Sequence, residues 1–177
     1  MQYINHYQSD IGGITLASDG QNITGLWLDG QKYFPYMLLE KALPEDLPVF
    51  ETAKKWLDIY FSGHEPEFTP PILLRGSAFR MEVWAELLNI PYGRVMTYGN
   101  IACAIAAKHG LKSMSSQAVG GAVGHNPISI IIPCHRVVGS NGSLTGYAGG
   151  IDKKIALLTH EGLDMKKYFI PKKDTAL

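Results

Sequence analysis

The side chains with the clearest chemical potential stand next to one another as Cys134, His135 and Arg136. They follow an apolar run and Pro133, so the sequence predicts a short buried strand over residues 128–132 that ends at this proline. Cysteine reacts as the thiolate, and a neighbouring imidazole or cation lowers the pKa of the thiol. The pattern therefore indicates that Cys134 is a nucleophile. Adjacent side chains on a strand point to opposite faces, so a direct contact with His135 is not guaranteed, and water or a third group could complete the relay.

Each of these candidates also has a structural interpretation. Most lone cysteines are inert core residues, and we interpret Cys103 in this way, because it lies in an apolar helix without a charged neighbour. Glu161, near the end of the last predicted helix, is a source of a carboxylate that could orient His135, although spacing alone leaves open that it is a surface residue. Six histidines and two cysteines occur, and no pair has a usual zinc-ligand spacing, so we predict no metal site and no cofactor.

The elements that must position these residues belong to a chain of ordinary globular composition. The 177 residues predict one domain or two small ones. A hydrophobic fraction of 46% and a charged fraction of 18% exclude a disordered chain and a coiled coil. The two cysteines exclude a disulfide scaffold. Because neither a secretory signal nor a long apolar run is evident, we expect a cytoplasmic protein with no membrane partner.

Charge is distributed unevenly along the chain, although the formal net charge is +0. Residues 1–88 hold 6 Lys and Arg against 12 Asp and Glu, which gives −6, and residues 89–177 hold 10 against 4, which gives +6. This asymmetry suggests a basic face on the second half that could bind nucleic acid. The alternative is an acidic part packed on a basic part with no such partner.

The first half predicts strands followed by a helix. Residues 3–7, 13–16 and 23–28 are expected strands, and a turn at 18–20 makes a hairpin of the last two. A helix is expected to open at the acidic residues 45–46 and to end before Gly63, because its apolar residues follow the helical period. Residues 63–71 contain three prolines and predict a linker.

The second half is predicted to be mainly helical. Ser77 and Thr97 are expected N-caps of two helices, and a further helix is expected from about residue 115 to 123. The last two of these are compatible with a helix-turn-helix, although the pattern alone favours a simple helical hairpin. Gly120 and Gly121 are unfavourable inside a helix, which suggests that a partner approaches the backbone closely. A last helix is expected over 151–161, followed by a basic and partly frayed tail from 166.

Several motifs resemble, in the same order, those of the 6-O-alkylguanine-DNA alkyltransferases, also called methylated-DNA–protein-cysteine methyltransferases. The most specific are GHNP at 124–127 and PCHRV at 133–137, and further matches run from Gly76 to Gly162. The resemblance implies an α/β, ribonuclease-H-like N-terminal domain at residues 1–75, built from an antiparallel sheet and a helix. It implies a mainly α, winged helix-turn-helix domain at 76–177.

The resemblance also implies a reaction. The alkylated guanine, or alkylated thymine, would be flipped out of double-stranded DNA, and Cys134 would take its alkyl group once, without turnover. His135 would deprotonate the thiol through a water, and Glu161 would orient the imidazole. Asn126 would tie the recognition helix to the active-site strand, and Tyr98 would donate to the guanine ring.

The resemblance also assigns pocket residues and DNA-binding residues to positions of this sequence. Val137, Tyr147, Ala148, Ser129 and Val123 would line the pocket for the base and its alkyl group. The protein would be a monomer, and its recognition helix would lie in the minor groove. The expected DNA-binding residues are Gln117, Ala118, Gly121, Ala122, Thr97 and Arg136. Arg136 would be either structural or phosphate-facing.

Two positions depart from the family's pattern. Gln117 stands where an arginine commonly intrudes into the duplex, and Ser129 replaces a proline that often lines the alkyl side of the pocket. Three other functions remain open: a non-catalytic lesion sensor, against which Cys134 argues, a DNA-binding redox sensor, and a cysteine hydrolase.

Overall fold

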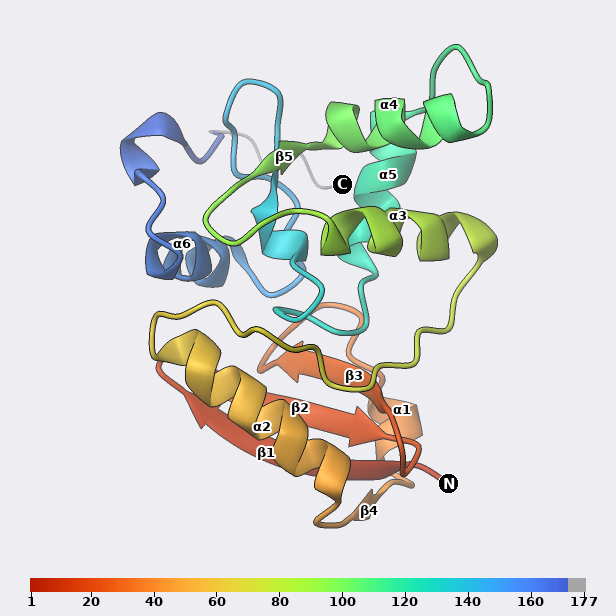
Figure 1. The fold of residues 1–177 in the computed structure, drawn as a ribbon, viewed down its shortest axis with the longest axis vertical. Helices are drawn as coiled ribbons and strands as arrows, with labels where there is room; N and C mark the ends of the chain where they lie inside the picture. Colours follow the sequence, from red (N-terminus) through yellow and green to blue (C-terminus); the bar gives the residue numbers. More distant parts are fainter. Residues whose placement is uncertain (172–177) are drawn as a thin grey trace. The chain divides into compact units, whose positions relative to one another are not determined.

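The computed structural model describes residues 1–171. The chain forms two compact units (Figure 1). The first consists of Met1–Arg75 together with Pro127–Ile131, and the second consists of Gly76–Asn126 and the chain from Ile132 onward. Among the described residues, no helix is long and apolar enough to cross a membrane.

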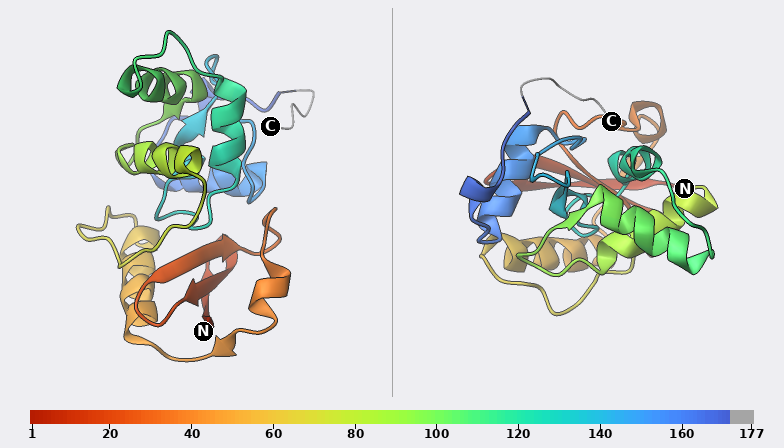
Figure 2. Two further views of the ribbon diagram at one scale, coloured as in Figure 1. Left: turned by 90° about the vertical axis from the view of Figure 1, so that its right-hand side faces the viewer. Right: turned by 90° about the horizontal axis from the view of Figure 1, so that it is seen from above.

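The first unit is a four-stranded sheet with a helix along one face (Figures 1 and 2). Its strands are β1 (Tyr3–Ser9), β2 (Gly12–Ser18), β3 (Ile23–Leu28) and β4 (Leu43–Pro44), in the order β3-β2-β1-β4. The pairs β1–β2 and β2–β3 are antiparallel, and β1–β4 is parallel. The predicted strands are confirmed, whereas β4 and the short helix α1 (Tyr36–Leu39) were not predicted.

Helix α2 (Pro48–Phe61) covers the sheet because its apolar residues recur at the helical period. Phe50, Ala53 and Leu57 are fully buried. The helix begins later than the acidic residues predicted, because Pro48 occupies its first turn, where the missing N–H costs nothing. Gly63 follows the helix with φ 87°, a conformation that glycine adopts readily.

The prediction of a strand over residues 128–132 is wrong. Only Ile128 forms a bridge, a parallel one with Leu26 of β3, and the chain then turns. Ile130 has φ 68°, which breaks an extended strand. The short-range bond from Ile131 N to Ser129 O (2.8 Å) replaces a ladder bond. The apolar run reflects burial, since a run of this length cannot by itself distinguish a strand from another buried segment.

The second unit contains the helices α3 (Ala78–Leu88), α4 (Tyr98–Lys108), α5 (Ser116–Gly124) and α6 (Ile151–His160). Ser77 accepts a hydrogen bond from Arg80 N and Thr97 accepts one from Asn100 N, so both predicted N-caps are confirmed. Helices α3, α4 and α5 pack against one another (Figure 2). The indole Nε1 of Trp84 in α3 donates to the carbonyl of Ala122 in α5 (2.9 Å), which fixes the position of α5.

The remaining elements of the second unit include the short turn that carries Cys134. A 3-10 turn, η1 (Cys134–Arg136), leads into β6 (Val137–Val138), which pairs in parallel with β5 (Met96–Thr97). A second 3-10 turn, η2 (Met165–Lys167), lies at the start of the tail, and Leu144 N donates to Phe169 O (2.8 Å). The end of the predicted frayed tail, 172–177, lies outside the described residues.

Candidate active site

Cys134 is the first residue of η1 and is 4% exposed. Its backbone N–H donates to Ile132 O (2.8 Å), so the turn that replaces the predicted strand presents the thiol. Asn126, directly after α5 and its C-cap, donates from Nδ2 to Ile132 O (2.8 Å) and to Cys134 Sγ (3.1 Å). An amide donor at this distance favours a sulfur that carries negative charge. The structure thus brings Asn126 and Cys134 together from the two ends of the apolar run.

His135 and Glu161 form a fully buried pair. His135 Nε2 lies 2.7 Å from Glu161 Oε1, and both side chains have no exposed surface. A carboxylate only accepts, so Nε2 carries the proton in the neutral ring and Nδ1 is the basic nitrogen. Glu161 is the C-cap of α6, and this end of the helix therefore delivers the carboxylate that sequence spacing could not place.

Arg136 also contacts Glu161. Its Nε donates to Glu161 Oε2 (2.9 Å), its Nη2 donates to Oε1 (3.0 Å), and its Nη1 donates to Ile90 O (2.6 Å). The Gly93 N–H donates to Oε2 (3.1 Å). The guanidinium, 5.6 Å from the centre of the Tyr92 ring, is thus occupied within the protein. Of the two roles expected for Arg136, this geometry supports the structural one, because all three guanidinium nitrogens donate to groups within the protein.

Burial and these contacts set the protonation states. Burial lowers the pKa of His135, although the Glu161 carboxylate opposes this, so the imidazole is neutral and can act as a base. Burial would raise the pKa of Glu161, but the His135 hydrogen bond and the Arg136 charge outweigh it and lower the pKa to about 2. Burial raises the pKa of the Tyr98 hydroxyl, which therefore stays protonated.

Sequence reasoning missed Lys154, which the structure places in the same region. Its Nζ donates to the carbonyls of Val137 (2.6 Å) and Thr145 (2.9 Å). The Tyr98 hydroxyl donates to the same Thr145 oxygen (3.0 Å). The only available signal was a lysine within an otherwise apolar stripe of the last predicted helix, and such a lysine is usually interpreted as exposed.

The other predicted pocket residues lie in different environments. Tyr147 is 6% exposed and Val123 is 2% exposed, whereas Ala148 is partly open, all within the second unit. Ser129 belongs to the first unit, where its hydroxyl donates to Gln31 Oε1 (2.9 Å). The same oxygen accepts from Leu28 N (3.2 Å), so the serine anchors the turn before Cys134 to the end of β3.

Three of the six predicted DNA-binding residues lie on the open side of α5. Gln117 and Ala118 are exposed, and a Cβ added at Gly121 would meet no atom within 4 Å. Nothing inside the protein therefore requires glycine at 121. Ala122 is 3% exposed, so its expected contact with DNA is not supported. Thr97 is half-buried as the cap of α4.

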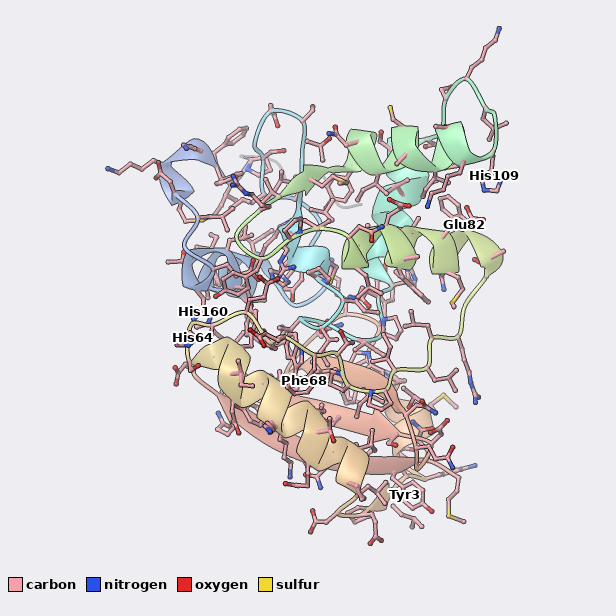
Figure 3. The ribbon with its side chains drawn as sticks, viewed as in Figure 1. Tyr3, His64, Phe68, Glu82, His109 and His160 are labelled. Carbon is pink, nitrogen blue, oxygen red and sulfur yellow. The ribbon has the colours of Figure 1, made fainter. Side chains whose placement is uncertain are left out.

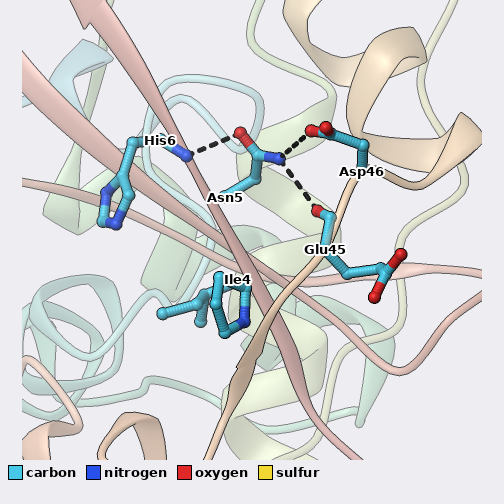
Figure 4. Close-up of a pocket in the computed structure, with 6 residues that line it drawn as sticks. Ile4, Asn5, His6, Glu45 and Asp46 are labelled. Atoms are coloured by element: carbon cyan, nitrogen blue, oxygen red, sulfur yellow. Dashed lines mark hydrogen bonds between the residues drawn. The ribbon is translucent and has the colours of Figure 1, made fainter.

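Outside this region, the described residues offer few candidates for catalysis or metal binding. Cys103 is exposed, so the expectation of a core residue is wrong, because α4 turns this position outward. No group of three metal-binding side chains occurs within residues 1–171. A pocket of about 390 Å³ in the first unit is bordered by β1 and β4, and there Asn5 donates to Asp46 and to the Glu45 carbonyl (Figure 4). None of the residues that line it is a cysteine, serine or threonine.

These features define a two-domain protein with a helical second domain, in which a buried free cysteine precedes a histidine paired with a carboxylate. Comparison with known families agrees. The 6-O-methylguanine DNA methyltransferase ribonuclease-like domain matches residues 3–74, and the DNA binding domain of the same family matches residues 78–163. The chain therefore belongs to the 6-O-methylguanine DNA methyltransferase family, which confirms the resemblance inferred from the motifs.

Individual relatives cover most of the chain. A methylated-DNA–protein-cysteine methyltransferase of Mycobacterium tuberculosis is 45% identical over 159 residues, which are 88% of this chain and 92% of the relative. One of Haemophilus influenzae is 39% identical over 160 residues, 90% of this chain and 86% of the relative. The crystal structure of Mycobacterium tuberculosis OGT in complex with DNA is 41% identical, with a TM-score of 0.78 and 94% of each chain covered.

Proposed function

We propose that this chain repairs DNA directly, by moving the alkyl group of 6-O-alkylguanine to its own Cys134 in a single turnover. The observation that carries this proposal is the buried Cys134 Sγ with the Asn126 amide 3.1 Å away, beside the His135–Glu161 pair. The names of the relatives and the DNA complex of one of them support the same activity. The proposal extends to 4-O-alkylthymine, whose alkyl group is also bound to a ring oxygen.

The proposed reaction balances with these residues alone. The thiol proton passes through a water to Nδ1 of His135, and Glu161 stabilises the imidazolium that forms. The Cys134 thiolate attacks the alkyl carbon, the S–C bond forms, and the C–O bond breaks with its electron pair left on the guanine oxygen. The Tyr98 hydroxyl donates a hydrogen bond to the ring and keeps its proton. The proton held on His135 passes back through water to the ring, so that the base leaves neutral and His135 returns to its neutral form. The thioether has no carbonyl for water to attack, so the protein acts once.

The pocket assignments are part of the same proposal. The carbonyls of Cys134 and Val137 would accept from the exocyclic amine, the Ala148 N–H would reach the guanine oxygen, and Tyr147 would border the alkyl group. Ser129 would influence the pocket only through the position of the turn, because its hydroxyl bonds Gln31.

DNA binding is assigned to the second domain. We infer that residues 76–177 form a winged helix-turn-helix in which α4 and α5 are the two helices, and that α5 enters the minor groove. The open side of α5 at Gly121 supports this, because a groove-binding helix needs small residues for a close approach. Residues 1–75 would be the ribonuclease-H-like domain, and the protein would act in the cytoplasm as a monomer.

The intact mass of the protein after incubation with a 6-O-methylguanine oligonucleotide tests this function. We expect the mass to rise by one methylene group, located on the peptide that contains Cys134, with a yield of one per protein. Cys134→Ser should abolish the gain and retain DNA binding, whereas Cys103→Ser, a matched change at the exposed cysteine, should leave it unchanged. Turnover without a mass gain would indicate a hydrolase, and oxidation without alkylation would indicate a redox sensor.

A further inference from the structure

The segment that leads to Cys134 contains residues of both compact units. Asn126 and Ile132 belong to the second unit, whereas the residues between them, Pro127–Ile131, belong to the first. Asn126 Nδ2 donates to the Ile132 carbonyl (2.8 Å), and this carbonyl also accepts from the Cys134 N–H (2.8 Å). The segment is therefore a loop that a hydrogen bond closes at its base, directly beside the proposed nucleophile.

Hydrogen bonds fix the body of this loop to the end of β3. Leu26 N donates to Pro127 O (2.9 Å), and Ser129 N donates to Leu26 O (2.9 Å). The Ser129 hydroxyl donates to Gln31 Oε1 (2.9 Å), which also accepts from Leu28 N (3.2 Å). Ser129 is 1% exposed and Gln31 is 5% exposed, so the bond between their side chains lies in a medium of low dielectric constant and is costly to lose.

The loop depends on these bonds because its backbone is unfavourable at Ile130. This residue has φ 68°, a left-handed conformation that a β-branched side chain rarely adopts. Such a conformation persists only where the surrounding structure determines it. Ser129, directly before Ile130, bonds through its N–H, through its hydroxyl and, by way of the Ile131 N–H (2.8 Å), through its carbonyl. Ser129 is thus the residue that fixes the turn.

A displacement of this turn would reach the thiol. Ile132 follows Ile130 after a single residue, and its carbonyl holds both the Cys134 N–H and the Asn126 amide. The same amide lies 3.1 Å from Cys134 Sγ. Because a hydrogen bond weakens steeply when its geometry is lost, a looser turn would weaken the contact between the amide and the sulfur.

We propose that Gln31 and Ser129 are positioning residues of the transfer reaction: their buried hydrogen bond holds the strained turn at Ile130 and thereby keeps the Asn126 amide on the Cys134 sulfur. This inference rests on the proposed function, because it concerns the thiol that takes the alkyl group. It gives the first domain a part in the reaction, since Gln31 sets the geometry of the thiol while neither Gln31 nor Ser129 touches the alkyl group.

The pH profile of Cys134 alkylation by iodoacetamide tests this role, in a Cys103→Ser background that leaves one thiol. The midpoint of the profile reports the stabilisation of the thiolate, whereas accessibility changes only the plateau. Ser129→Ala should raise the midpoint and slow the reaction at pH 7 about 2- to 10-fold, the factor that corresponds to one ordinary hydrogen bond. Ser18→Ala is the matched control, because it removes a serine hydroxyl of the same unit that is 0% exposed and accepts from Gly20 N (2.9 Å). It should leave the profile unchanged.

A double-mutant cycle separates positioning from a general loss of stability. If Ser129 acts through the Asn126 amide, Ser129→Ala should shift the midpoint of the wild type and leave that of Asn126→Ala unchanged, because the amide is already absent there. Gln31→Met removes the acceptor of the same bond and should reproduce the shift, and it decides the matter if Ser129→Ala does not fold. A Ser129→Ala midpoint equal to that of Ser18→Ala, or equal shifts with and without the Asn126 amide, would overturn the inference.

These measurements use no DNA, so they separate the positioning role from the proposed function. A protein that shows the coupling and takes no methyl group from DNA would refute the proposed function alone. A protein that repairs DNA while its midpoint does not respond to Ser129→Ala would refute the positioning role alone. With duplex DNA at saturation, Ser129→Ala should lower the single-turnover rate and leave the affinity for DNA unchanged.

Discussion

Glu161→Gln should destabilise the protein and slow the transfer together, because one carboxylate serves two purposes. It accepts from His135 Nε2, which orients the base, and from Arg136 and Gly93, which join η1 to the turn before β5. A glutamine of the same shape removes the charge and replaces one acceptor oxygen by an NH₂ donor that faces N–H groups. The buried Arg136 then loses its counter-ion.

Two arguments about the same buried carboxylate give the expected loss of stability. A carboxyl pKa lowered from 4.5 to about 2 contributes roughly 3 kcal/mol to the free energy of unfolding at neutral pH, since each pKa unit is worth about 1.4 kcal/mol. Breaking a buried ion pair by removing one partner costs about 3–5 kcal/mol. We therefore expect a loss of about 3–5 kcal/mol in urea unfolding at pH 7.

The sign of the pH dependence is also determined. The pKa of Glu161 is lower in the folded state than in the unfolded state, so its contribution is complete above the unfolded value and is lost as the pH falls toward about 2. The difference in unfolding free energy between wild type and Glu161→Gln should therefore be constant near neutral pH and shrink in acid.

Glu82→Gln is the matched control. Glu82 Oε2 lies 2.8 Å from His109 Nε2 in an exposed carboxylate–histidine pair (Figure 3). Exposed pairs contribute about 0–1 kcal/mol, so this variant should unfold almost as the wild type does and transfer methyl at the same rate. Equal unfolding free energies for the two variants, or a wild-type transfer rate for Glu161→Gln in folded protein, would refute the reasoning.

Three further variants test the thiol and the DNA-binding face. Asn126→Ala removes a hydrogen-bond donor to Cys134 Sγ. Since a hydrogen bond to a charged group is worth about 1.5–3 kcal/mol, iodoacetamide should alkylate Cys134 at least about tenfold more slowly at pH 7. An unchanged rate would show that the amide does not stabilise the thiolate. If Gln117 fills the gap left by the flipped base, Gln117→Ala should slow the repair of duplex DNA several-fold and leave transfer from the free base unchanged. Gln117→Arg should keep or raise the rate of duplex repair. Equal rates of duplex repair for Gln117→Ala and wild type would exclude this role. Gly121→Ala should leave the free energy of unfolding unchanged or raise it by up to about 1 kcal/mol, because the added Cβ lies within 4 Å of no neighbouring atom. The same change should weaken binding to duplex DNA. An unaltered affinity in a filter-binding or anisotropy assay would place α5 away from the DNA.

Most secondary structure was predictable because it depends on local patterns. Apolar residues at the helical period and a Ser or Thr at the N-cap are sufficient for α3 and α4, since each helix satisfies its hydrogen bonds locally. The short strands β4 and β6 were not predictable, because two residues form a strand only when a partner strand is present. The prediction of a strand over 128–132 was wrong, because an apolar run indicates burial and does not by itself indicate an extended backbone.

The family was evident in the sequence, and so was the candidate nucleophile, since PCHRV and GHNP are contiguous motifs. The roles of the charged residues were decided only by the tertiary structure. Whether Arg136 faced a phosphate or a carboxylate depended on the distance to Glu161, which lies 25 residues away. Lys154 gave only a weak signal, its position within the apolar stripe of α6, because a lysine has the same local spacing whether it is solvated or buried. Electrostatic interactions depend on distance in space and on exclusion of water, and neither quantity is encoded in local sequence spacing.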